Sequence, residues 1–157
     1  STVVALLSQS VTALDEHRDA GRLLIGLHVP GHTDWATVIA SGVSVLSLPA
    51  GAGLSGWADT LGDFLDRGGR IAWGAVPVDQ PLGTSEELLW RRLSSVWCEL
   101  VGEGLDPLVV RQRSLVSPVD GLGHFGASQA DRVLELVDSL SRRVGRQAIA
   151  ARLSLGA

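Results

Sequence analysis

The stretch GLHVPGHTDW at residues 26–35 decides the fold, because an apolar run ends there in polar side chains, as in a β-strand that leads into a functional site. Three later segments repeat this arrangement, at residues 45–49 (VLSLP), 71–79 (IAWGAVPVD) and 115–123 (LVSPVDGLG). A helical pattern of apolar residues follows each of them. Strands that alternate with helices form parallel sheets with right-handed crossovers, so the four strand ends should share one rim of an α/β sheet.

Hydrophobic periodicity predicts the elements along the chain. The expected strands cover residues 23–29, 43–48, 70–76 and 108–117, and the expected helices cover residues 3–14, 35–40, 57–65, 84–100, 128–144 and 147–155. Thr84 and Glu87 have the spacing of a capping box, and Ser128 is the expected cap of the next helix. No linker interrupts the pattern, which predicts a single domain over residues 1–157.

Composition narrows the class of protein. A chain of 157 residues with 45% apolar content can bury one core, and a net charge of -4 gives no reason to expect nucleic acid or an anionic membrane as partner. Cys98 is the only cysteine, which excludes an internal disulfide and favours a reducing compartment. The first residues lack a basic region and a long apolar run, so we expect no signal peptide, no membrane span and a cytoplasmic location.

Two glycine-rich segments match the dinucleotide-binding pattern GxGxxG, at residues 51–56 (GAGLSG) and 121–126 (GLGHFG). Asp79 follows the next strand, about where a ribose-binding acid could stand. The pattern arises easily by chance in a chain with 19 glycines, and here a helix and a strand precede it. Nucleotide binding is therefore kept as an alternative.

Histidines and carboxylates gather at the predicted strand ends. His28 and His32 flank a turn, and Asp120 or His124 could join them in a carboxylate and imidazole site. A single histidine at a rim is more often a hydrogen-bonded structural residue, so metal binding stays open. A serine hydrolase is disfavoured because the chain has no GxSxG nucleophile elbow.

Four motifs occur in an order that resembles one family: residues 28–35 (HVPGHTDW), 45–48 (VLSL), 72–77 (AWGAVP) and 118–123 (PVDGLG). They are similar to cobalamin-independent methionine synthase, and more closely to short proteins of the methionine synthase and uroporphyrinogen decarboxylase superfamily. The resemblance covers roughly residues 22–145. It implies the last four strands of a (β/α)8 TIM barrel, so that the single domain is the C-terminal half-barrel of a methionine-synthase-like catalytic domain.

The resemblance also implies a zinc-dependent reaction, but the zinc ligands are largely replaced. In the family a histidine, two cysteines and an acid bind zinc, which activates the thiol of homocysteine for methyl transfer from a methylfolate. His28 matches the histidine, whereas Pro30, Pro49 and Asp120 stand at the other ligand positions. Proline has no side-chain donor, so we expect a degenerate zinc site and assign no metal or cofactor.

The resulting hypothesis is a methionine-synthase-like methyltransferase fold whose activity is doubtful or altered. We expect His28, Asp120 and His124 as catalytic groups, and His32, Asp34 and Asp79 as contacts to a small-molecule substrate. The alternatives are a non-catalytic binding or assembly module and a nucleotide-binding α/β protein. A half-barrel has two unpaired edge strands, so the expected partner is an N-terminal half-barrel or a second copy of the chain.

Overall fold

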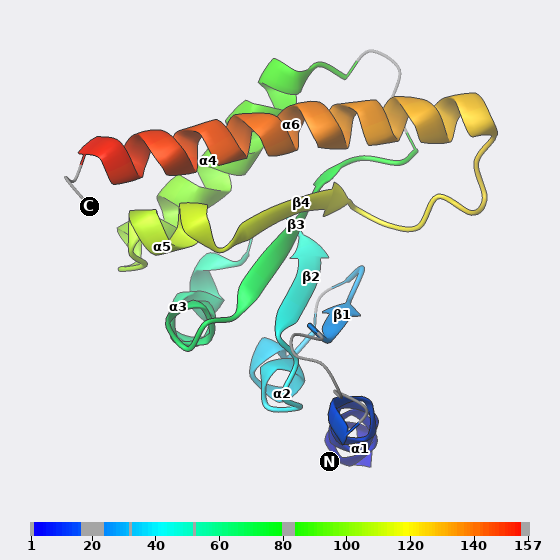
Figure 1. Ribbon diagram of the computed structural model, residues 1–157, viewed down its shortest axis with the longest axis vertical. Helices are drawn as coiled ribbons and strands as arrows, with labels where there is room; N and C mark the ends of the chain where they lie inside the picture. The colour runs from blue at the N-terminus through cyan, green and yellow to red at the C-terminus, as the bar shows by residue number, and fades with distance from the viewer. Residues whose placement is uncertain (1, 17–23, 32, 52, 80–83, 155–157) are drawn as a thin grey trace.

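The computed structural model describes residues 2–16, 24–31, 33–51, 53–79 and 84–154. Within them, four strands form one parallel sheet in the order β1-β2-β3-β4 (Figure 1). The strands are β1 (Gly26–His28), β2 (Val45–Pro49), β3 (Arg70–Val76) and β4 (Ser114–Pro118). The helices are α1 (Thr2–Glu16), α2 (Trp35–Ile39), α3 (Ala58–Asp66), α4 (Glu86–Gly102), α5 (Pro107–Gln112) and α6 (Ala127–Ser154), with a short 3-10 helix η1 (Ser55–Trp57) before α3. The predicted α/β class with a parallel sheet is confirmed.

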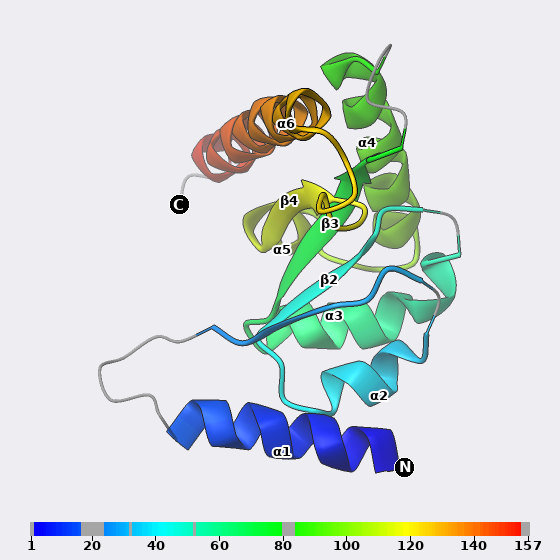
Figure 2. The same ribbon diagram turned by 90° about the vertical axis from the view of Figure 1, so that its right-hand side faces the viewer.

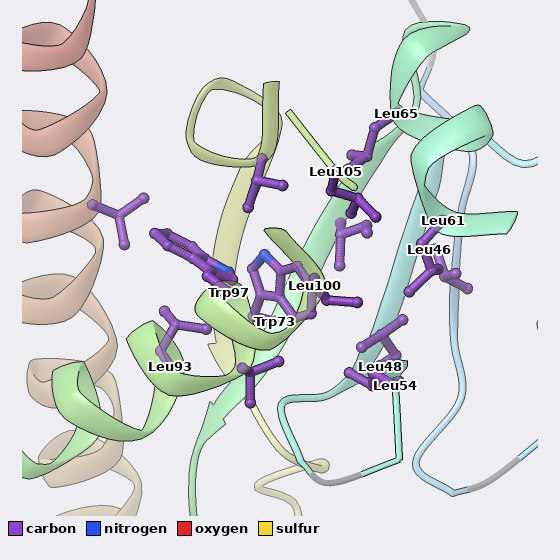
Figure 3. Packing of buried hydrophobic residues seen from close by; sticks show 14 of the residues in the cluster. Leu46, Leu48, Leu54, Leu61, Leu65, Trp73, Leu93, Trp97, Leu100 and Leu105 are labelled. Atoms are coloured by element: carbon purple, nitrogen blue, oxygen red, sulfur yellow. The ribbon is translucent and has the colours of Figure 1, made fainter. Parts of the chain in front are cut away.

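The helices bury one face of the sheet. Leu46 of β2 pairs with Ile71 of β3, and Leu48 pairs with Trp73; all four side chains are fully buried. Figure 3 views this face, with α4 in front of β3 and with α6 and α3 on either side. Figure 2 shows α1 next to α2 at the β1 end of the sheet and α6 at the β4 end. A single helical layer therefore carries the core.

The opposite face of the sheet is left open by the described helices. Residues paired across parallel strands lie on the same face and alternate along each strand. The residues of this open face are Gly26, His28, Val45, Ser47, Pro49, Arg70, Ala72, Gly74, Leu115 and Ser117. In its central row, His28 and Leu115 are exposed and Ser47 and Ala72 are half-buried. Small and polar side chains therefore line a surface that would face inward if the sheet closed into a barrel.

Three tryptophans organise the core between β3 and α4. Trp73 and Trp97 pack edge to face with ring centroids 6.3 Å apart, and Trp90 packs against Trp97 at 6.0 Å. The indole N–H of Trp73 donates a hydrogen bond of 2.6 Å to Oγ of Ser114 at the start of β4. Edge-to-face packing of this kind adds to the gain from burying the aromatic surface. It fixes α4 over the centre of the sheet.

The prediction of a strand over residues 108–117 was wrong in its first half. Residues 107–112 form α5, because the carboxylate of Asp106 accepts hydrogen bonds from the N–H groups of Leu108 and Val109, at 2.6 and 3.2 Å. Pro107 stands at the first turn, where a missing N–H costs nothing. These start signals outweigh the β-propensity of the apolar run that follows, and β4 begins only at Ser114.

Two predicted helix starts and one predicted helix also need correction. The cap of α4 is Ser85, not Thr84: Oγ of Ser85 accepts from the N–H of Leu88 at 3.2 Å. Ser128 lies inside α6, which begins at Ala127. The same helix continues to Ser154, so no separate helix starts at residue 147. Of the strand expected at residues 23–29, residue 23 lies outside the described residues, and β1 is limited to Gly26–His28.

Candidate functional site

The candidate site lies at the carboxyl ends of the strands and is centred on His28. Nδ1 of His28, the last residue of β1, is 2.8 Å from Oγ of Ser47 in β2, which is a hydrogen bond in either direction according to the tautomer. Nε2 of the same ring is 3.8 Å from Oδ1 of Asp120, two residues beyond β4. Both nitrogens of the imidazole therefore have a polar neighbour, one from β2 and one from the loop after β4.

The loop after β4 reaches His28 by crossing the end of the sheet. The N–H of Val119 donates to the carbonyl of Val76 at 2.9 Å, which extends the pairing of β4 beside β3. A Cβ on Gly74 would lie 3.1 Å from Cα of Val119 and 3.2 Å from the carbonyl oxygen of Leu48. Any side chain at residue 74 would therefore press on the backbone of the two neighbouring segments. The register also shifts between Gly74 and Val76, as at other β-bulges beside functional sites.

Asp120 is held at its own turn but stays open to solvent. Its Oδ1 accepts a hydrogen bond of 2.7 Å from the N–H of Gly121. The side chains of His28 and Asp120 are 41% and 62% exposed, so water screens the attraction between them. The pair is accessible to a ligand and contributes little to folding.

Ser47 and Ser117 are members of this region that the sequence interpretation missed. Ser117 belongs to the open face, where it pairs with Gly74, and its Oγ is buried with no hydrogen-bond partner among the described residues. A serine next to buried apolar residues of a strand, as with Ser47 in residues 45–49 and Ser117 in residues 114–118, is the signal that could have identified both. The strand register places these two hydroxyl groups on the face opposite the core.

The structure gives Asp34 a structural partner. Its carboxylate caps α2 by accepting from the hydroxyl of Thr37 at 2.6 Å and from the N–H of Thr37 at 3.3 Å. These hydrogen bonds, the one from the hydroxyl first, lower the pKa of Asp34. Asp34 is thus engaged in forming a helix start, and its role in substrate binding stays a prediction.

The other predicted site residues are not joined to His28 by any contact within the described part of the chain. Asp79 and His124 are exposed on the loops after β3 and β4. His32 lies outside the described residues. The structure therefore brings together His28 and Asp120 of the predicted set and adds Ser47.

The donor set does not fit the zinc site of the family that the sequence resembles. Across the described ranges, no three side chains of histidine, cysteine, aspartate or glutamate come together as metal ligands. His28 and Asp120 supply two donors, and Pro30 and Pro49 supply none. A structural or catalytic zinc ion takes three or four protein ligands, so the described residues supply fewer donors than that site needs.

The geometry gives limited support to the nucleotide-binding alternative. The glycine-rich segment 51–56 leads into the 3-10 helix η1 rather than directly into α3. The strand order β1-β2-β3-β4 also has no reversal, whereas dinucleotides bind at the point where the order of strands reverses. This alternative stays a prediction.

Comparisons of the chain with models of protein families, with curated proteins and with solved structures give no match. No helix in the described parts of the chain is long and apolar enough to cross a membrane. The class defined so far is an α/β protein with a four-stranded parallel sheet and a polar cluster at the carboxyl ends of its strands.

Proposed function

We propose that this chain is one half of a methionine-synthase-like barrel, and that its rim binds a small polar substrate once a second half completes the sheet. The observation that carries the proposal is the position of His28, which lies between Ser47 and Asp120 at the carboxyl ends of parallel strands. Active sites of (β/α)8 barrels are built at this end of the strands. The motif order of the sequence supports the same family.

The strand order explains why a second half is needed and why a copy of the same chain can supply it. β1 and β4 are the two edges of the sheet, and each has one unpaired side. A twofold axis along the barrel would place β4 of one copy beside β1 of the other, twice, with all strands parallel. The result is a closed sheet of eight strands, and the open faces of the two copies fill its interior.

The chemistry proposed for the completed rim is methyl transfer to a thiol, with His28 in place of the zinc ion. The thiol sulfur attacks the methyl carbon of a methylated amine donor, and the bond between that carbon and the donor nitrogen breaks. Nε2 of His28 accepts the thiol proton, and the departing nitrogen takes a proton from solvent. The carboxylate of Asp120, with Oδ1 3.8 Å from Nε2, would attract the positive charge of the protonated imidazole.

A second candidate function, a non-catalytic assembly module, is favoured by one observation. Pro30 and Pro49 replace two ligands of the resembled site, and the remaining His28 and Asp120 are both exposed in the single chain. On this alternative the chain associates through its open face, and the polar rim carries no reaction.

Two measurements test the proposal. Light scattering from 1 to 200 μM protein should show a dimer, and a monomer at every concentration would contradict the assembly.

The second measurement is turnover. The dimer, treated with a chelator, is given homocysteine and a methylfolate. Turnover should be lost in the double variant His28→Ala/Asp120→Ala and kept in Asp131→Asn, an exposed carboxylate on α6. A dimer without turnover would support the assembly module.

A further inference from the structure

A groove on the helical layer, away from the rim, has the composition of a small-molecule site. It lies between α4 and α5, has a volume of about 340 Å³ and has a mainly apolar surface. The lining residues are Trp90, Ser94, Trp97, Cys98, Val101, Gly102, Pro107, Val110 and Arg111. All of them belong to α4 or α5, so the groove shares no residue with the His28 cluster. Pockets for small ligands have this size and this apolar character.

Two buried polar groups on α4, among the residues that line this groove, have no hydrogen-bond partner in the described structure. They are Nε1 of Trp97 and Oγ of Ser94. Trp97 is only 5% exposed, and its N–H can only donate. Trp73, by contrast, donates its indole N–H to Ser114. Buried donors of this kind are normally satisfied, so the two on α4 call for an explanation such as a bound acceptor.

Arg111 makes the groove positive. It is the one charged residue in the lining, and no acidic side chain accompanies it there. Within the described ranges, its guanidinium forms no ion pair and no side-chain hydrogen bond. Arg143, in contrast, is paired with Glu86 and Glu87. An unpaired arginine beside an apolar wall is complementary to an organic anion, because a carboxylate accepts two hydrogen bonds from a guanidinium.

We propose that the groove between α4 and α5 binds a small amphipathic carboxylate. The apolar body of the ligand packs against Trp90, Val101 and Val110. Its carboxylate pairs with Arg111, and the buried donors of Ser94 and Trp97 favour an acceptor on the same side of α4. The class of ligand follows from the two groups that can only donate: an ionised carboxylate has only acceptors, whereas an ammonium group or a hydrocarbon would leave Arg111 and the indole N–H of Trp97 unpaired. This site is independent of the proposed methyl transfer.

The test uses 2-naphthoate as the probe and 2-naphthol as its uncharged counterpart. Tryptophan fluorescence and calorimetry on the whole chain should show saturable binding of naphthoate, with at least tenfold weaker binding of naphthol. The variant Arg111→Gln should weaken naphthoate at least tenfold, because a charge-assisted hydrogen bond is lost. The control Arg92→Gln, on the exposed side of α4, should change the affinity for naphthoate less than twofold.

A second readout needs no variant. Cys98 lines the groove and is exposed, so saturating naphthoate should slow its alkylation by iodoacetamide at least fivefold, and naphthol should not.

A further variant tests the indole N–H. Trp97→Phe removes this donor and keeps an aromatic ring, and should weaken the binding of naphthoate about threefold or more. The proposal is overturned by an absence of saturable binding, by equal affinity for naphthol, or by unchanged affinity in Arg111→Gln.

Discussion

Nε2 of His28 lies 3.8 Å from Oδ1 of Asp120, although His28 ends β1 and Asp120 follows β4, the strands at opposite edges of the sheet. Adjacent strands are about 4.8 Å apart, so β2 and β3 alone separate β1 from β4 by about 14 Å in a flat sheet. The contact therefore requires the loop after β4 to fold back across the strand ends. Gly74 favours this crossing, because a Cβ there would crowd the backbone of Val119 and Leu48.

The first prediction concerns the weight of this contact in folding. Because both side chains are more than 40% exposed, Asp120→Asn should change the free energy of unfolding by less than about 1 kcal/mol, as for other surface ion pairs. Urea unfolding at pH 7 measures the change, with Asp131→Asn as the control. A loss well above that limit would show that Asp120 holds the loop, and would weaken its assignment to the substrate site.

The second prediction concerns Gly74. A methyl group there would meet only backbone atoms, which cannot rotate away, so Gly74→Ala should destabilise the fold by about 1–3 kcal/mol. Gly145 provides the control, since nothing lies within 4 Å of its Cβ position in the middle of α6. Gly145→Ala should therefore stabilise the protein by about 0.5–1 kcal/mol. Equal effects of the two variants would contradict the close crossing at Gly74.

Much of the fold could be predicted because its signals are local. The strand expected at residues 70–76 is β3 residue for residue, since the pair Gly68-Gly69 precedes it and Pro77 ends it. The meeting of His28 with Asp120 also followed from the rule that parallel strands share one carboxyl end.

The errors have equally physical causes. The apolar run after Pro107 has the composition of a strand, and only the cap at Asp106 turns it into a helix. Ser47 lies inside the strand predicted over residues 43–48, and no local pattern marks it as a site residue, because its partner His28 is 19 residues away. Such contacts depend on the register between strands, which no local pattern contains.

The third prediction concerns pH. The pKa of Asp34 is lowered in the folded protein by the hydrogen bonds from Thr37, so the folded state binds its proton less readily than the unfolded chain does. The ionised carboxylate of Asp34 therefore contributes to the free energy of unfolding. This contribution is fully present above the pKa of an unfolded aspartate, about 3.9, and is lost as the pH falls through the lower pKa of the folded state. Asp34→Ala, which removes the acceptor for both hydrogen bonds, should therefore lower the thermal midpoint at pH 7, and the difference from the wild type should narrow as the pH falls below about 3.9. A difference between the two proteins that does not change with pH would contradict the role of the ionised cap.

The fourth prediction separates the two faces of the sheet. Leu46 is fully buried under the helices and Leu115 is 43% exposed on the open face. Leu46→Ala should cost about 2–5 kcal/mol of the free energy of unfolding, whereas Leu115→Ala should change it by about 0.5 kcal/mol in the dissociated chain.

If the open face lies inside an eight-stranded assembly, Leu115→Ala should also weaken the association at least tenfold, because a leucine removed from a core loses its packing. Leu134 is the matched control, since it is a leucine 52% exposed on α6, and Leu134→Ala should leave the association unchanged. Sedimentation equilibrium measures the dissociation constants. Equal constants for Leu115→Ala and the wild type would place the association surface elsewhere than on the open face.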